Sequence, residues 1–236
     1  MGLMREIIFD TETTGLSPEN GDRIVEFGAI ELINRMPTGT VFHAYYNPDR
    51  PVDAVAQAIH GLSDAFLADK PLFDEAVEDL LDFLGDDPLI AHNAMFDLGF
   101  LNHELAQCGR LVIPRERIID TLSMARTKFP GAKHSLDALC VRFGIDRSHR
   151  VKHGALLDAE LLAQVYIELL GGRQMGLELT EGVIETTKGS LNTEYIPMLH
   201  NDRTPKQHGV SAEEIARHAT FLKQLIDPLW SHPETI

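Results

Sequence analysis

The chain has 236 residues, 44% of them hydrophobic, which is enough to bury a substantial core in one domain with an appendage. Its formal net charge of −15 argues against a uniformly basic nucleic-acid-binding surface, because Lys and Arg normally supply the phosphate contacts. No stretch approaches the ~20 apolar residues needed to cross a bilayer, and the first residues lack the apolar run of a signal peptide. We therefore expect a cytoplasmic protein that makes no membrane contact.

The first part of the chain predicts an antiparallel meander of three strands. Apolar, strand-like runs occupy residues 5–10, 23–33 and 40–46, and turn residues separate them. The first of these runs ends in a carboxylate, Asp10.

The next part of the chain alternates helices with strands. Helices are predicted at residues 72–84, 94–108, 121–128, 135–143 and 155–170, and strands at residues 88–91 and 117–120. Asn93 stands where it would cap the second of these helices. Together with the meander, this order predicts an α/β fold in which helices flank a mixed sheet.

The composition changes after Gly172. Residues 180–209 are rich in Thr, Glu, Gly, Asn and Pro, as linkers are, whereas residues 211–230 recover a helical pattern with Ser211 and Glu214 as a capping box. A lone amphipathic helix after a linker needs a partner surface. The predicted organisation is therefore a domain at 1–172, a linker at 173–209 and a helical tail at 210–236.

One segment reverses the overall charge. Between Arg110 and Lys152, ten Lys or Arg side chains stand against four acids, a local net charge of +6. Such a segment fits a phosphate backbone, and it fits an ordinary solvated helical face equally well. Charge alone therefore leaves nucleic-acid binding open.

Two carboxylates close the first predicted strand. Asp10 and Glu12 lie two residues apart, so their side chains project from the same face of the sheet. Neighbouring carboxylates repel each other, and a hard divalent cation between them would stabilise the pair. An acidic strand end in water would have the same spacing, so the metal hypothesis requires further carboxylates to converge there.

Two further acids and a histidine are candidates for the same site. Asp97 and Asp158 each lie on the apolar stripe of a predicted helix, where a carboxylate is costly unless it is paired or bound to metal. His153 stands five residues before Asp158, too far around a helix to share its face, and we place it on the preceding loop. An imidazole is the side chain best suited to act as a general base near neutral pH.

Three motifs together resemble a known family. DTETTG from Asp10, NAMFD from Asn93 and HGALLD from His153 are similar to the exonuclease motifs of the DEDDh branch of the DEDD exonuclease superfamily. Within that branch, SLDALC at residues 135–140 resembles the epsilon subunits of bacterial DNA polymerase III, which are proofreading 3′-5′ exonucleases. The likeness covers about residues 5–172.

The resemblance implies a ribonuclease-H-like fold that uses two divalent cations, Mg²⁺ or Mn²⁺. In the family pattern Asp10 contacts both ions, Glu12 and Asp158 hold the ion that activates water, and Asp97 serves the other ion directly or through water. His153 removes a proton from the attacking water. The residues that match positions near the terminal nucleotide are Thr13, Thr14, Leu16, His60, Asn93 and Phe96.

The resemblance also implies partners. The substrate is a DNA primer 3′ end, from which mismatched nucleotides leave as nucleoside 5′-monophosphates. The tail resembles the segment that binds the DNA polymerase III alpha subunit, and Gln174, Leu177 and Leu179 resemble a peptide that binds the sliding clamp. A small accessory subunit is compatible with the same pattern.

Two other functions fit the sequence less well. An exoribonuclease acting on RNA 3′ ends would share the motifs, but a free-standing ribonuclease would not need the tail. A noncatalytic subunit that stabilises the polymerase would need the tail, but it would not need all five catalytic positions.

Overall fold

The computed structural model of the protein describes residues 3–148, 150, 152–172 and 211–223. The chain divides into two compact units, Met1–Leu179 and Thr180–Ile236, and one helix of the second unit is described. The predicted linker, with Gln174, Leu177 and Leu179, lies outside the described residues.

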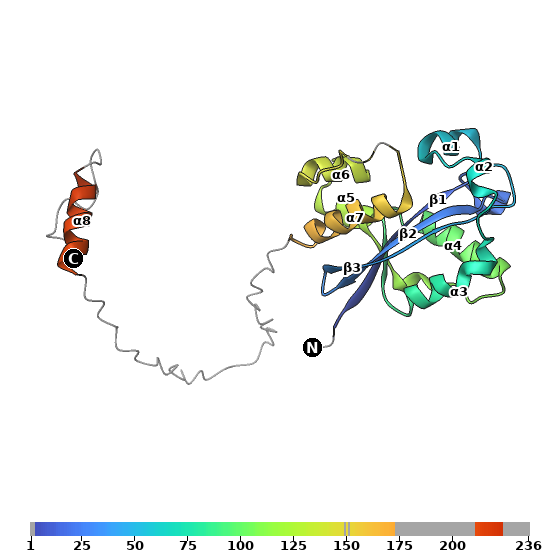
Figure 1. Ribbon diagram of the computed structural model, residues 1–236, viewed down its shortest axis with the longest axis horizontal. Coiled ribbons are helices and arrows are strands. Elements are labelled where there is room, and N and C mark those ends of the chain that lie inside the picture. The colour runs from blue at the N-terminus through green and yellow to red at the C-terminus, as the bar shows by residue number, and fades with distance from the viewer. Residues whose placement is uncertain (1–2, 149, 151, 173–210, 224–236) are drawn as a thin grey trace, which may run out of the picture. The chain divides into compact units, whose positions relative to one another are not determined.

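The first unit is built on a five-stranded sheet with the order β3-β2-β1-β4-β5 (Figure 1). The antiparallel strands β1, β2 and β3 pair in sequence, and β4 and β5 continue the sheet parallel to β1. β1 is therefore a central strand with hydrogen-bonded neighbours on both sides. The strands are β1 (Arg5–Thr13), β2 (Ile24–Ile33), β3 (Met36–Tyr45), β4 (Leu89–Ala91) and β5 (Ile118–Asp120).

Helices cover both faces of this sheet (Figure 1). One face carries α3 (Phe73–Leu84) and α4 (Met95–Gln107). The other face carries α5 (Thr121–Lys128), α6 (Leu136–Phe143) and α7 (Ala155–Leu169). The short helices are α1 (Ala54–His60), α2 (Asp64–Leu67) and two 3₁₀ turns, η1 (Pro18–Asn20) and η2 (Arg115–Arg117).

The two faces of β1 belong to different parts of the core. Ile7 and Phe9 pack in the cluster that contains Leu101 of α4, whereas Ile8 packs in the cluster that contains Leu162 of α7. Successive side chains of a strand point to opposite faces. Even-numbered residues of β1 therefore face α7.

Most predicted elements are confirmed, with shifted ends. β1 runs three residues further than predicted, because its pairing with β2 continues to Thr13. The short helices α1 and α2 were not predicted, and the prediction that Asn93 caps α4 is wrong. The N-cap residue of α4 is Ala94, and Asp120 Oδ1 accepts hydrogen bonds from the backbone N–H groups of Asn93 (3.0 Å) and Ala94 (3.3 Å).

The described helix of the second unit is α8 (Ala212–Leu222). Its predicted capping box is confirmed, because Glu214 N–H donates to Ser211 Oγ (3.2 Å) and Ser211 N–H donates to Glu214 Oε2 (2.9 Å). Within its own unit α8 leaves Ile215 and Phe221 exposed. In the described part of the chain, every helix is too short or too polar to cross a membrane.

Candidate active site

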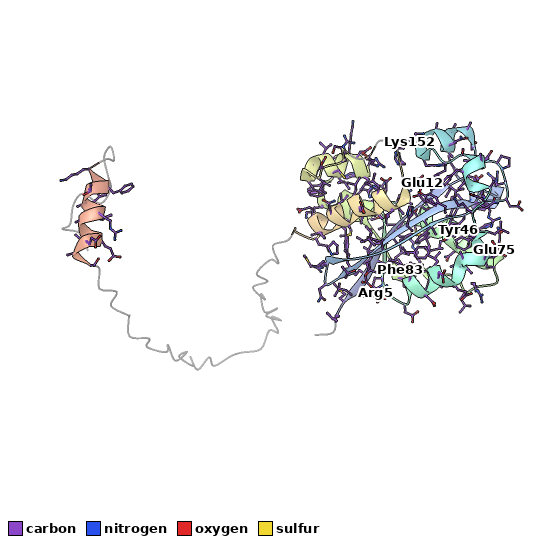
Figure 2. The ribbon with its side chains drawn as sticks, in the orientation of Figure 1. Arg5, Glu12, Tyr46, Glu75, Phe83 and Lys152 are labelled. Carbon is purple, nitrogen blue, oxygen red and sulfur yellow. The ribbon has the colours of Figure 1, made fainter. Side chains whose placement is uncertain are left out.

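The site begins at the C-terminal end of β1, which Figure 2 shows at Glu12, far from Arg5 at the other end of the strand. Asp10 and Glu12 share the strand face that looks toward α7, as their even numbers require. Opposite Asp10 on β2 lies Gly28. A Cβ atom at Gly28 would stand 2.2 Å from the backbone nitrogen of Leu156, so the missing side chain lets the start of α7 lie directly on the sheet.

This close approach brings Asp158 to the site. Asp158 lies in the first turn of α7 and is 3% exposed. Carboxylate oxygens of Glu12 and Asp158 and a ring nitrogen of His153 all lie within 4.8 Å of one another. The structure therefore gathers three of the predicted residues around one point.

Asp97 reaches the site from the opposite face of the sheet. It lies in the first turn of α4 and is 3% exposed. Its Oδ1 accepts hydrogen bonds from the Thr11 backbone N–H (3.1 Å) and from Thr11 Oγ1 (2.7 Å). Thr11 lies between Asp10 and Glu12 but points the other way, so β1 fixes acids on both of its sides.

Burial and mutual repulsion make these acids hard to ionise together. Burial, followed by the charges of Asp97, Asp158 and Glu12, raises the pKa of Asp10 well above its ordinary value. Burial and then the charge of Asp158 raise the pKa of Glu12 to about 8. Burial raises the pKa of Asp97 to about 7, although its hydrogen bonds with Thr11 act in the opposite direction. The four carboxylates therefore carry more negative charge than their surroundings neutralise.

The donor set fits divalent cations. Hard ions such as Mg²⁺ and Mn²⁺ prefer carboxylate oxygens, and they supply positive charge that would neutralise this cluster. Asp10, Glu12, Asp97 and Asp158 offer such oxygens from β1, α4 and α7.

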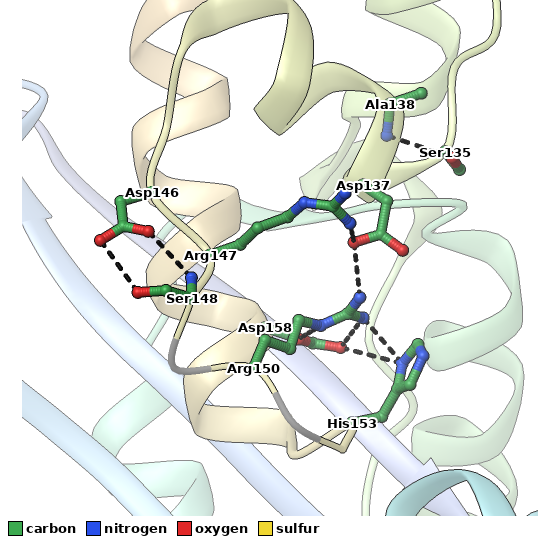
Figure 3. Close-up of polar contacts among 9 residues, drawn as sticks. All are labelled: Ser135, Asp137, Ala138, Asp146, Arg147, Ser148, Arg150, His153 and Asp158. Carbon is green, nitrogen blue, oxygen red and sulfur yellow. Dashed lines mark hydrogen bonds and ion pairs between the residues drawn. The ribbon is translucent and has the colours of Figure 1, made fainter.

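One arginine enters the cluster. Arg150 Nε and Nη2 donate to the two carboxylate oxygens of Asp158 at 2.5 Å and 2.6 Å, and Nη1 lies 2.8 Å from Asp137 Oδ1 (Figure 3). Its Nη2 also lies 2.7 Å from His153 Nδ1. Only 9% of the Arg150 side chain is exposed.

His153 lies on the loop before α7, as predicted. Its side chain is 46% exposed, and its backbone N–H donates to the carbonyl oxygen of Ile59 in α1 (3.4 Å). The unpredicted helix α1 therefore helps to hold the histidine loop over the carboxylates.

The sequence and fold of known proteins agree with this geometry. Residues 7–166 match the exonuclease family RNase_T. The DNA polymerase III subunit epsilon of Rickettsia felis is 48% identical over 232 residues, which cover 96% of this chain and 99% of the relative. The subunit of the same name from Escherichia coli K12 is 42% identical over 230 residues, which cover 93% of each chain.

The chain belongs to the DNA polymerase III epsilon family.

Solved exonuclease structures have the same fold as this epsilon-family chain. Exonuclease X in complex with 5′-overhanging duplex DNA is 30% identical, with a TM-score of 0.55 over 70% of this chain and 90% of that one. The nuclease domain of 3′hExo, a DEDDh family member bound to rAMP, is 19% identical, with a TM-score of 0.62 over 71% and 92%. The epsilon-family chain is thus an exonuclease with the predicted ribonuclease-H-like fold, and exonucleases of its family use divalent metal ions.

The predicted substrate residues of the epsilon-family chain differ in exposure. Thr13, Thr14 and His60 are buried, with Thr14 Oγ1 donating to Asp22 Oδ1 (3.2 Å) and His60 Nδ1 accepting from the Leu62 backbone (3.0 Å). Leu16 is 84% exposed, Asn93 is exposed with a φ of 64°, and Phe96 is half-buried against Phe100. Leu16 and Asn93 are therefore the members of this set most available to a ligand.

Sequence reasoning missed two charged residues beside the carboxylates. Arg150 entered it only as one member of a basic segment. Glu26, opposite Glu12 on β2, is 3% exposed, and its Oε1 lies 2.7 Å from His43 Nε2. A signal for Glu26 was its place between the apolar residues Val25 and Phe27 of a mostly apolar strand.

Proposed function

We propose that this epsilon-family exonuclease proofreads DNA as a subunit of the bacterial replicative polymerase. It removes mismatched 3′-terminal nucleotides by hydrolysis and releases nucleoside 5′-monophosphates. The observation that carries the proposal is the gathering of Glu12, Asp158 and His153 within 4.8 Å at the end of β1, beside Asp10 and Asp97, where burial raises the pKa of Asp10, Glu12 and Asp97.

Asp10, Glu12, Asp97 and Asp158 would hold two divalent cations, Mg²⁺ or Mn²⁺. When bound, these ions favour ionisation of the attacking water and offset charge on the phosphate and on the leaving 3′ oxygen. The protein holds the four carboxylates in place through the register of β1, the Thr11–Asp97 hydrogen bonds and the close contact between Gly28 and α7.

His153 acts as the general base. Its imidazole lies at the solvent side of the cluster, within 4.8 Å of Glu12 and Asp158 oxygens, where an attacking water would approach. A half-exposed imidazole can accept a proton from that water and pass it to solvent.

The enzyme discriminates between paired and mismatched primers by how easily the terminal base pair opens at the edge of the site, which we call the rim and which Leu16, Asn93 and Phe96 form. Leu16 is the exposed apolar side chain that follows β1, and it stacks against the terminal base, with Asn93 and Phe96 on the α4 side. The buried Thr13, Thr14 and His60 support this surface. Mismatched ends open more easily, so they reach the carboxylates more often than paired ends do.

Release of 3′-terminal nucleotides from paired and mismatched DNA primers tests this function. We expect faster release from mismatched ends in Mg²⁺ or Mn²⁺, no release in EDTA, and slower release from matched RNA ends. Preferred hydrolysis of RNA ends would support the exoribonuclease instead. An absence of hydrolysis, even after the polymerase is added, would support the noncatalytic assembly subunit.

The tail at 210–236 binds the polymerase alpha subunit, while residues 1–172 form the catalytic domain. α8 is well capped and exposes Ile215 and Phe221, as a helix does before it docks into an apolar groove. Deleting the residues after about 200 should leave hydrolysis of a free primer intact and abolish co-purification with the alpha subunit. Retained co-purification would contradict this assignment.

The segment at 173–209 links the two and binds the sliding clamp. Gln174, Leu177 and Leu179 have the spacing of a short clamp-binding peptide, and a tethered contact raises the local concentration of the exonuclease at the primer. Replacing all three with alanine should weaken clamp binding without changing hydrolysis of a free primer. The same triple-alanine variant can also be tested for binding of a small accessory subunit.

A further inference from the structure

Arg150 holds two residues of the proposed reaction at once. It makes a bidentate contact with Asp158 and a single contact with His153, and its remaining terminal nitrogen contacts Asp137 (Figure 3). A planar guanidinium contacting both oxygens of a carboxylate is among the stronger ion pairs in proteins. Because Asp158 is 3% exposed, this pairing replaces the hydration that its carboxylate loses on burial.

The contact with His153 sets the tautomer of its imidazole. A guanidinium can only donate, so His153 Nδ1, 2.7 Å from Arg150 Nη2, must accept. The same Nδ1 lies 3.2 Å from Asp158 Oδ2, but it cannot donate to that oxygen while it accepts from Arg150. A neutral imidazole that accepts at Nδ1 carries its proton on Nε2, so neither nitrogen has a free lone pair for water.

The contact with Asp158 uses the oxygens that a cation requires. Nε and Nη2 of Arg150 lie 2.5 Å and 2.6 Å from the two oxygens, so the guanidinium covers the carboxylate. A divalent ion on Asp158 would also repel the guanidinium at this short distance. Charge repulsion therefore sets the bidentate pair and a cation bound by Asp158 against each other, so each weakens the other.

A second partner is ready for the displaced side chain. Arg150 Nη1 lies 2.8 Å from Asp137 Oδ1, and the Asp137 side chain is 45% exposed. Both residues line an open hollow of about 510 Å³, together with Ser148 and Lys152. The guanidinium can leave Asp158 and turn into this space while it keeps Asp137.

We propose that Arg150 is a positioning residue that holds Asp158 and His153 in the metal-free site and is displaced from Asp158 by the arriving cation. Its departure frees both Asp158 oxygens and the Nδ1 lone pair of His153 in one movement. The exonuclease therefore exchanges an internal cation for an external one when it becomes active. This inference rests on the proposed function, because it takes Asp158 as a ligand.

Binding of Mn²⁺ to the full chain without DNA tests the exchange. The variant is Arg150→Gln, and the matched control is Arg147→Gln, because Arg147 also contacts Asp137 (2.7 Å) but, among the described residues, forms no ion pair with the four carboxylates of the site. Removing the competitor should tighten Mn²⁺ binding roughly tenfold in Arg150→Gln, the equivalent of about one charge-assisted contact. Arg147→Gln should bind as the wild type does. Equal or weaker binding by Arg150→Gln would overturn the proposal.

Two further measurements guard against a folding defect. Arg150→Lys keeps the charge but cannot make the bidentate contact, so its Mn²⁺ affinity should lie between those of the wild type and Arg150→Gln. In ¹⁵N NMR spectra of the metal-free wild type, the His153 signal, assigned with a His153→Gln variant, should show the proton on Nε2. A proton fixed on Nδ1 would overturn the proposal.

The same titrations separate this inference from the function on which it rests. If Asp158→Asn abolishes Mn²⁺ binding while Arg150→Gln leaves it unchanged, the metal site stands and the exchange is wrong. If the wild type itself does not bind Mn²⁺, the metal site and the exchange both fail.

Discussion

The two ends of β1 differ in how their acidic side chains are neutralised. At its start, Arg5 donates to Glu31 Oε1 (2.6 Å), to Asp87 Oδ2 (2.6 Å) and to the Phe83 carbonyl oxygen (2.8 Å), so one cation is shared by two acids and a helix end. At its finish, four acids converge, and Arg150 donates to both carboxylate oxygens of one of them, Asp158. Figure 2 shows the two regions at Arg5 and Glu12.

The pKa shifts at the two ends have opposite signs. Hydrogen bonds from Arg5 and Thr38 lower the pKa of Glu31, as in an ordinary structural ion pair. At the other end burial raises the pKa of Glu12 to about 8. The first arrangement stabilises the fold, whereas the second costs stability until a cation binds, which is typical of a functional site.

The largest expected effect is on catalysis. Asp10→Asn should lower the rate of 3′-nucleotide release at least about a thousandfold, equivalent to about 4 kcal/mol, because a proposed ligand of both cations is lost. The matched control at the start of β1 is Asp87→Asn, which removes an Arg5 contact and should leave the rate within about twofold. Comparable losses in single-turnover assays of the two variants would contradict the distinction between the ends.

Packing at the carboxylate end gives the next largest effect. Gly28→Ala would place a methyl group 2.2 Å from Leu156 N, so it should destabilise the protein by about 3 kcal/mol and move Asp158 away from Asp10. Gly99→Ala in α4 is the control, because a Cβ there meets nothing within 4 Å, and it should be neutral or stabilising by about 0.5 kcal/mol. Chemical denaturation measures both changes, and equal stability of the two variants would argue against the tight contact.

The pH dependence of stability should differ in sign between the two ends of β1, because the pKa of Glu12 is raised and that of Glu31 is lowered. Glu12 favours its protonated form in the fold, so the metal-free wild type loses stability as the pH rises from about 4.5 toward 8. Glu12→Gln lacks this loss and should be more stable than the wild type in EDTA at pH 8, by about 2 kcal/mol, with little difference at pH 5. Comparing the variant with the wild type cancels the opposite trend from His60 and His92, whose pKa values are lowered by burial.

The control for this prediction is Glu31→Gln. The pKa of Glu31 is lowered, so its contribution is present above about pH 4.5 and is lost as the pH falls through the lowered value. Glu31→Gln should therefore be less stable than the wild type at pH 8, by up to about 1 kcal/mol after screening by solvent. If both substitutions change stability in the same direction, the contrast between the ends is wrong.

The smallest expected effect is at the rim. Leu16→Ala should slow release from paired primer ends about fivefold, the equivalent of about 1 kcal/mol of stacking, and leave the melting temperature unchanged because Leu16 is 84% exposed. Release from mismatched ends should change less, since those ends open without the help of a side chain that stacks against the terminal base. An equal loss on both primers would remove Leu16 from the discrimination step.

Local patterns predicted much of the fold and four acids of the site. Asp10 and Glu12 follow from strand alternation, and Asp158 follows from its place on the apolar stripe of α7. Arg150 pairs with Asp158 across a loop, and helix or strand periodicity in the sequence cannot predict such a contact. The cap of α4 was missed for the same reason, because Asp120 supplies it from 26 residues further along the chain.

The pairing of β1 on both sides bears on how this enzyme can change over evolutionary time. A one-residue slip of β1 would turn Asp10 and Glu12 to the opposite face, and pairing with both β2 and β4 opposes such a slip. Insertions and deletions can therefore accumulate only outside this strand. Adaptation to new nucleic-acid ends is thus left to surface positions such as Leu16, while the inherited spacing of the carboxylates stays the same.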